Sequence, residues 1–228
     1  MNTGISEAAH QAWMLAAVYD GWAGPGLLAA YEAERRPVAE AISGFATGIG
    51  EALLGLVTTD VDEEDTPAGA AFREQLARAA EKADQDQYKP IGLSFGYHYY
   101  SSPLLADDRP PPDFTISIYQ PSTAPGARLP HLTFADGGSV YDHLGRDFTL
   151  LRIGPDLPDV GPFVGAAADR AVPVDILDLP SDAAVERYGK RLILVRPDQR
   201  IAWRGDALPA RPDSLVDRVR GGTVPRPE

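Results

Sequence analysis

The side chains best suited to chemistry in this sequence are its four histidines, His10, His98, His131 and His143. They fall in different segments, and none has the short spacing by which metal-binding histidines share one site. We therefore expect each to be a surface or hydrogen-bonded residue, and we predict no metal site. The sequence contains no cysteine, which excludes disulfides, thiol catalysis and cysteine-ligated zinc.

Short motifs that bind nucleotides or metals, or that activate a serine, are absent. The sequence has no G-x-G-x-x-G, Walker A, H-E-x-x-H, G-x-S-x-G or EF-hand pattern. An aromatic segment between Ile91 and Tyr100 is a candidate for ligand contact, through Phe95, Tyr97 and Tyr99 as well as Tyr100. Its rings either pack on the core from a strand or extended segment, or line part of an aromatic substrate pocket.

The first residues predict a helix whose N-terminal end has the chemistry of an anion site. Asn2 or Thr3 can cap a helix that starts here, and Glu7 lies close to its positive end. The N–H groups of a first turn lack partners within the helix, so they either serve only as a capped terminus or contact a negatively charged group. One apolar face follows at helical spacing, formed by Ile5, Ala8, Ala12, Leu15 and Tyr19.

A second helix is predicted to begin near Pro25, because proline suits a first turn. Pro37 marks a break or kink in it, and the run Glu34–Pro37 is expected to form i,i+4 and interdomain ion pairs. An acidic loop over Asp60–Asp65 and a third helix over 68–84 come next. The second helix carries an apolar stripe of Leu27, Leu28, Tyr31, Val38, Ile42, Phe45 and Ile49.

Composition limits the kinds of partner. With 228 residues the chain is long enough for one large domain or two small ones, and 44% hydrophobic residues are enough for a core. A formal net charge of −12 argues against nucleic acid and against anionic membranes. No apolar run is long enough to span a bilayer, and the N-terminus has no signal-peptide pattern, so we expect a cytoplasmic protein.

The second half alternates between strands and helices in the order β-α-β-α-β-β-α, which is typical of a thioredoxin-like domain. A further hairpin is predicted over 131–141. Without cysteine this domain cannot perform dithiol exchange. The strands are predicted at 148–153, 172–177, 192–195 and 201–203, and the helices at 163–170, 182–188 and 213–220.

Several separate motifs, in order, resemble one family. The matching runs are Met1–Ile5 with Glu7, Ala8, Trp13 and 15–18; Gly24–Leu28 and Tyr31–Pro37; Gly96–Tyr99; Pro125–His131; Phe148–Arg152; Leu194–Gln199; and Trp203–Asp206. Together they resemble the C-terminal half of the FAD-dependent aromatic hydroxylases, which include phenol hydroxylase and aromatic-polyketide hydroxylases. The resemblance covers nearly the whole chain but lacks the N-terminal Rossmann half of the family.

This resemblance implies a cofactor and a site. Met1, Asn2, Thr3 and Gly4 match the family's third flavin-contact segment, so their peptide N–H groups are expected to lie against the flavin. FAD is the implied cofactor, on the condition that a partner chain completes the site, and NAD(P)H is the implied reductant. His10 departs from the family pattern, as do Gln11 and Met14, and Glu7 replaces the usual aspartate. No catalytic residue is assigned.

The fold class expected is α+β. A helical segment over 1–100, the remainder of a flavin monooxygenase catalytic domain, is followed by a Pro-rich linker over 101–117 and a thioredoxin-like α/β domain over 118–228. The function expected is that of a flavin monooxygenase acting on phenolic or polyketide-type aromatic substrates, inactive until completed by an FAD-domain partner chain. A homo-oligomer is also expected, since apolar faces of the first two helices would be exposed. The alternatives are a non-catalytic interaction module and a truncated product without function.

Overall fold

The structure, a computed structural model, describes residues 2–54, 63, 65–105 and 115–223. The chain divides into two compact units: one comprises residues 1–37, 97–112 and 121–228, and the other residues 38–96 and 113–120. The domain boundaries expected near residues 100 and 118 remain a prediction. Part of the expected linker and most of the acidic loop lie outside the described residues.

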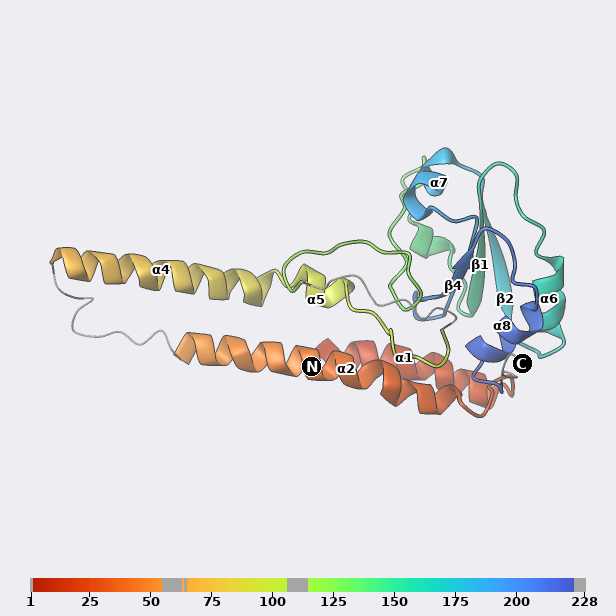
Figure 1. Cartoon of the computed structure of the whole chain (residues 1–228), viewed down its shortest axis with the longest axis horizontal. Coiled ribbons are helices and arrows are strands. Elements are labelled where there is room, and N and C mark those ends of the chain that lie inside the picture. The colour runs from red at the N-terminus through yellow and green to blue at the C-terminus, as the bar shows by residue number, and fades with distance from the viewer. Residues whose placement is uncertain (1, 55–62, 64, 106–114, 224–228) are drawn as a thin grey trace. The chain divides into compact units, whose positions relative to one another are not determined.

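Seven α-helices and a four-stranded sheet are formed by the described residues, and Figure 1 labels most of them. In chain order they are α1 (Asn2–Tyr19), α2 (Leu27–Leu54), α4 (Pro67–Tyr88), α5 (Ile91–Phe95), the 3-10 helix η1 (Val140–His143), β1 (Phe148–Ile153), α6 (Gly161–Ala168), β2 (Val174–Leu179), α7 (Asp182–Tyr188), β3 (Leu192–Val195), β4 (Ile201–Gly205) and α8 (Pro212–Val219). The mixed helix and strand content confirms the coarse fold class.

The sheet has the strand order β2-β1-β3-β4. β1 pairs with β2 in parallel, and β3 runs antiparallel to both β1 and β4. The short β3–β4 connection is the predicted hairpin. β2 begins two residues later than predicted, at Val174, because Ala171 takes a positive φ of 53° before the chain enters the strand.

Alternate side chains of the strands bury opposite faces of the sheet. One face carries Phe148 and Leu194 and packs against α6, α8 and α1. The other face carries Leu151 and Ile193 and packs against α7 and η1. The first unit therefore has helices on both sides of one mixed sheet.

Helix α1 buries one apolar face and exposes another. Met14 and Ala17 are fully buried, and the ring of Trp13 lies 6.1 Å from that of Phe148 on β1. The stripe seen in the sequence lies on the exposed side of the helix. Ile5, Leu15 and Tyr19 are 67%, 56% and 91% exposed, so the expected exposed apolar face on this helix is present.

Helix α2 continues through Pro37, where the sequence predicted a break or kink. The helix is therefore not broken, although the division between the two compact units falls after this residue. A proline removes one helical hydrogen bond without preventing the chain from continuing the helix. The connection from α1 to α2 is tied to the end of α8, since Gly24 N donates to Arg220 O at 2.6 Å and Gly26 N to Gly221 O at 2.8 Å.

The second unit contains the rest of α2 together with α4 and α5. Thr66 caps α4, its Oγ1 accepting from Gly69 N at 3.1 Å. The expectation of a strand or extended segment over 91–100 is wrong for its first half, because residues 91–95 form α5. Leu93 N on α5 donates to Ile116 O at 3.0 Å, and Gly92 lets the two backbones approach closely.

The hairpin expected over 131–141 is present only as a single bridge between Thr133 and Ser139. Ser139 instead caps η1, in a capping box with Asp142, and this cap ends the extended pairing. Among the helices in the described ranges, none is long and apolar enough to cross a membrane.

Candidate functional site

The residues predicted to contact a cofactor lie at the start of α1. Met1 lies outside the described residues, whereas Asn2 begins the helix, Thr3 is half-buried and Gly4 is exposed. A Cβ atom placed on Gly4 would meet no atom within 4 Å, so the described structure leaves open space there. The first turn contains no acidic side chain that would compete for its N–H groups. The N-terminal end of α1 therefore has room and positive polarity for a negatively charged group.

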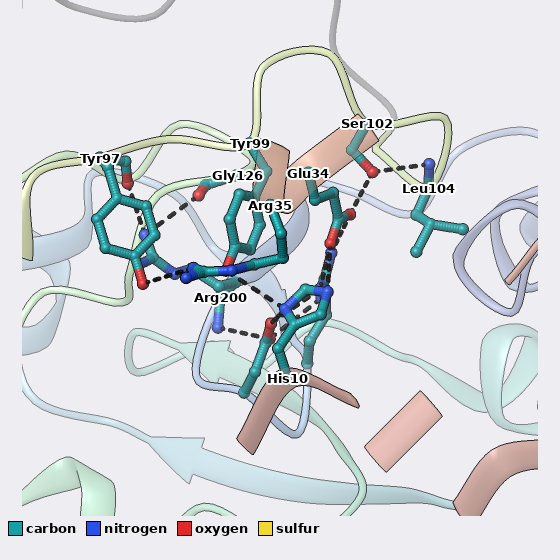
Figure 2. Close-up of polar contacts among 11 residues, drawn as sticks. His10, Glu34, Arg35, Tyr97, Tyr99, Ser102, Leu104, Gly126 and Arg200 are labelled. Carbon is teal, nitrogen blue, oxygen red and sulfur yellow. Dashed lines mark hydrogen bonds and ion pairs between the residues drawn. The ribbon is translucent and has the colours of Figure 1, made fainter. Parts of the chain in front are cut away.

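A buried charged cluster lies further along α1 and joins it to α2 and to the β3–β4 turn. Glu34 of α2 and Arg196 of the turn form a bidentate ion pair with distances of 2.6 and 2.8 Å. Arg196 also pairs with Asp198 at 2.8 Å, and all three side chains are buried. Ser102 donates a further hydrogen bond to Glu34, as Figure 2 shows.

His10 of α1 lies between the two carboxylates of this cluster. Its Nε2 is 2.9 Å from Glu34 Oε2, and its Nδ1 is 2.9 Å from Asp198 Oδ2. The ring therefore contacts both carboxylates, and its Nδ1 also lies 3.3 Å from the hydroxyl of Tyr99. The expectation that His10 is a surface or hydrogen-bonded residue fits its contact with the Tyr99 hydroxyl.

The electrostatics of the cluster favour ionised carboxylates. Burial by itself raises the pKa of Glu34, but the Arg196 charge and the hydrogen bonds from His10 and Arg196 lower it to about 2. Burial likewise opposes ionisation of Asp198, and Arg196 and His10 lower its pKa below the ordinary value. Both side chains are therefore charged at neutral pH although they are buried.

Two tyrosines and two arginines extend the cluster on one side. Arg35 donates to the hydroxyls of Tyr99 at 3.2 Å and Tyr97 at 3.4 Å, and the Arg200 guanidinium lies 3.8 Å from the centre of the Tyr97 ring (Figure 2). Burial raises the pKa of Tyr97, but the charges of Arg200 and Arg35 outweigh it, so the net shift is downward. Burial dominates for Tyr99 and raises its pKa.

The sequence suggested that the rings of the aromatic segment either pack on the core or line part of a substrate pocket, and the rings differ in burial. Tyr99 is 3% exposed and lies in the charged cluster, so its ring packs in the core as one interpretation expected. Phe95 and Tyr100 are exposed, at 41% and 57%. A role in a substrate pocket remains a prediction for the segment.

The i,i+4 ion pair expected for the run Glu34–Pro37 is confirmed, whereas its interdomain character stays a prediction. Arg36 pairs with Glu32 at 2.9 Å with i,i+4 spacing, and Glu34 makes the long-range pair with Arg196. The sequence did not reveal that His10 and Asp198 belong to the same cluster. Asp198 stands in the turn sequence Pro197-Asp198-Gln199. Because aspartate is common in turns, nothing in the sequence indicated that this residue has a distant partner.

The cluster can orient helices, but nothing in it indicates bond-making chemistry. Within the residues that the structure describes, no group of histidine, aspartate or glutamate side chains could hold a metal ion. The hydroxyl of Ser102, next to Glu34, already accepts from Leu104 N and donates to Glu34. Its contacts are those of a structural hydroxyl.

Comparison with known protein families gives two matches that follow one another along the chain. Residues 1–46 match the FAD binding domain, and residues 122–221 match the aromatic-ring hydroxylase C-terminal domain. The chain belongs to the aromatic-ring hydroxylases. It corresponds to the C-terminal part of this family, as its sequence motifs suggested.

Individual aromatic-ring hydroxylases and related monooxygenases match over almost the whole chain. The FAD-dependent monooxygenase apdD of Emericella nidulans is 34% identical over 96% of the chain and 37% of its own length. Phenol 2-monooxygenase of Pseudomonas sp. is 32% identical over 98% of the chain and 42% of its own length. The solved structure of the rebeccamycin biosynthetic enzyme RebC with reduced flavin aligns with a TM-score of 0.86 and 37% identity, over 98% of the chain and 42% of RebC. The chain thus spans about two fifths of these relatives.

Proposed function

We propose that this chain supplies the C-terminal part of an FAD-dependent monooxygenase that hydroxylates aromatic substrates of the phenolic or polyketide type. The observation that carries the proposal is the pair of family matches in order along the chain. Relatives and solved neighbours with such activities support the substrate class: they include phenol 2-monooxygenase and aklavinone-11 hydroxylase in complex with FAD and aklavinone. Activity requires the FAD-binding part that makes up the rest of those proteins.

The start of α1 is our proposed cofactor contact, through the peptide groups of Met1, Asn2, Thr3 and Gly4. Open space at Gly4 and the lack of an acidic side chain in the first turn fit a flavin edge that becomes negative on reduction. The flavin, when bound, would supply the redox chemistry, with NAD(P)H as the reductant. The chain's own contribution is to hold a positive helix end beside it.

We also propose that the second half of the chain is a thioredoxin-like domain. The strand order β2-β1-β3-β4, with a parallel first pair and an antiparallel hairpin, supports this interpretation. Because the sequence contains no cysteine, such a domain cannot act by dithiol exchange. Its role is therefore structural support or an interface.

A hybrid protein tests the proposal. The N-terminal part of RebC that this chain does not match is joined to Met1, and the product is purified beside the chain alone. We expect the hybrid to show the absorbance band of bound oxidised flavin at about 450 nm and to oxidise NAD(P)H when a phenolic substrate is added. The chain alone should be colourless. A well-folded hybrid without bound flavin would contradict the proposal and favour a non-catalytic module.

A further inference from the structure

We propose that Arg196 and Asp198, in the turn between β3 and β4, are positioning residues for the N-terminal turn of α1. They act through His10 and Glu34. The inference rests on the proposed function, in which the first turn of α1 contacts the flavin. Arg196 and Asp198 would then fix the position of this turn relative to the flavin.

The connection from the turn to α1 consists of short, buried contacts. Asp198 Oδ2 is 2.9 Å from His10 Nδ1, and Arg196 holds Glu34 in two hydrogen bonds. Glu34 in turn lies 2.9 Å from the other ring nitrogen of His10. His10 stands six residues after Gly4, which corresponds to roughly 9 Å along a helix. The cluster therefore contacts α1 within two helical turns of Gly4, the last residue of the proposed flavin contact.

The turn that holds α1 is itself tightly fixed. Arg196 N donates to Arg200 O at 2.8 Å, and Gln199 N donates to Arg196 O at 2.9 Å. The Asp198 carboxylate receives Arg196 Nε at 3.1 Å as well as Arg200 N at 3.3 Å. Because these bonds leave the turn little freedom, it can act as a fixed reference point for the helix.

The other contacts of α1 give weaker directional control: its ion pair between Glu7 and Arg35 is long, at 3.8 Å, and partly exposed, and the remaining buried side chains make apolar contacts. Trp13, Met14 and Ala17 pack on the sheet by apolar contact, which depends weakly on rotation or small axial shifts of the helix. The bidentate hydrogen bonds between Arg196 and Glu34 tolerate much smaller displacements, and each carboxylate lies 2.9 Å from a ring nitrogen of His10. Buried ion clusters often add little net stability compared with apolar packing, so a geometric role accounts better for this one.

Hydrogen exchange of the full chain tests the positioning directly. We compare Asp198→Asn with the unchanged protein and with Asp178→Asn, a matched control that breaks a bidentate ion pair between β1 and β2. We expect Asp198→Asn to accelerate exchange of the α1 amides from Glu7 to Trp13 by about tenfold or more, while β1 and β3 keep their protection. The control should leave α1 unchanged. Unchanged exchange of α1 in Asp198→Asn would overturn the proposal.

A second variant covers the case in which Asp198→Asn loses its fold. His10→Gln keeps the ion pairs of Arg196 with Glu34 and Asp198, and removes only the imidazole that connects them to α1. It should accelerate exchange in α1 in the same way with the sheet protected. If α1 keeps its protection in His10→Gln, the proposal is wrong.

The hybrid with the RebC part separates this inference from the proposed function. With Asp198→Asn the hybrid should bind FAD about tenfold more weakly, whereas Asp178→Asn should bind it as the unchanged hybrid does. Equal FAD affinity in Asp198→Asn and the unchanged hybrid would overturn the positioning role. An unchanged hybrid that binds no flavin would overturn the proposed function, and the exchange of α1 would still decide whether Arg196 and Asp198 position the helix.

Discussion

At the scale of single residues, two carboxylates are kept charged in the interior by one arginine and one histidine. Glu34 and Asp198 share Arg196, and His10 lies 2.9 Å from each of them. The sequence indicated that Glu34 would form an ion pair, because it stands in a charged run on a helix. The partner 162 residues away could not be predicted, since it depends on how the sheet meets the helices.

The pH dependence of stability should report on Glu34. Its pKa is lowered from 4.5 to about 2 in the folded chain, so its contribution is complete above pH 4.5 and is lost as the pH falls toward 2. We expect the free energy of unfolding to fall by about 3 kcal/mol from this residue over that range. Urea unfolding of Glu34→Gln should show a flatter pH dependence. Glu74→Gln, which changes an exposed carboxylate on α4, should behave as the unchanged chain, and equal slopes for both variants would contradict the assignment.

At the scale of elements, the strands and helices of the second half were predictable and the faces of α1 were not. Alternation and turn residues placed the four strands within two residues of their observed starts. α1 is apolar on two sides, so its sequence cannot tell which side meets the sheet. Residues 91–95 were mistaken for an extended segment because their helix is only five residues long and is fixed by a backbone contact to Ile116.

The α1–α2 connection should tolerate no side chain at Gly24. A Cβ atom there would lie 2.3 Å from Gly222 N and 2.4 Å from Gly221 O, so Gly24→Ala must displace the end of α8. We expect a loss of about 1–3 kcal/mol in the free energy of unfolding, measured by tryptophan fluorescence in urea. Gly44→Ala is the control, because a Cβ there meets no atom within 4 Å and alanine favours the interior of α2. Equal stabilities of the two variants would show that α8 does not pack as described.

The exposed stripe on α1 should cause self-association of the isolated chain. Leu15 and Tyr19 are large apolar side chains in contact with solvent, and Leu15 lines a hollow together with Leu28 at the start of α2. We expect light scattering to show oligomers that decrease in Leu15→Glu, whereas Ser6→Glu on the same helix should change nothing. A monodisperse monomer of the unchanged chain would contradict this expectation.

At the scale of the whole molecule, the chain joins a helix with an open N-terminal end to an α/β domain that holds it in place. Sequence motifs were sufficient to identify the family, because they are local and occur in a fixed order. The sequence motifs predicted a cofactor contact at Met1, Asn2, Thr3 and Gly4, and this contact remains a prediction. The charged cluster could not be predicted from motifs, because it is formed by residues that lie far apart in the sequence.

The affinity of the RebC hybrid for FAD, compared between Gly4→Asp and Ala9→Asp, tests the central claim most directly. A carboxylate at Gly4 would face the flavin but would not harm the helix, since negative charge stabilises a helix N-terminus. Ala9 is exposed further along α1 and serves as the control. The account predicts that Gly4→Asp weakens binding of reduced FAD by roughly tenfold while Ala9→Asp leaves it unchanged. Equal affinities for the two variants would contradict the claim that the start of α1 contacts the flavin.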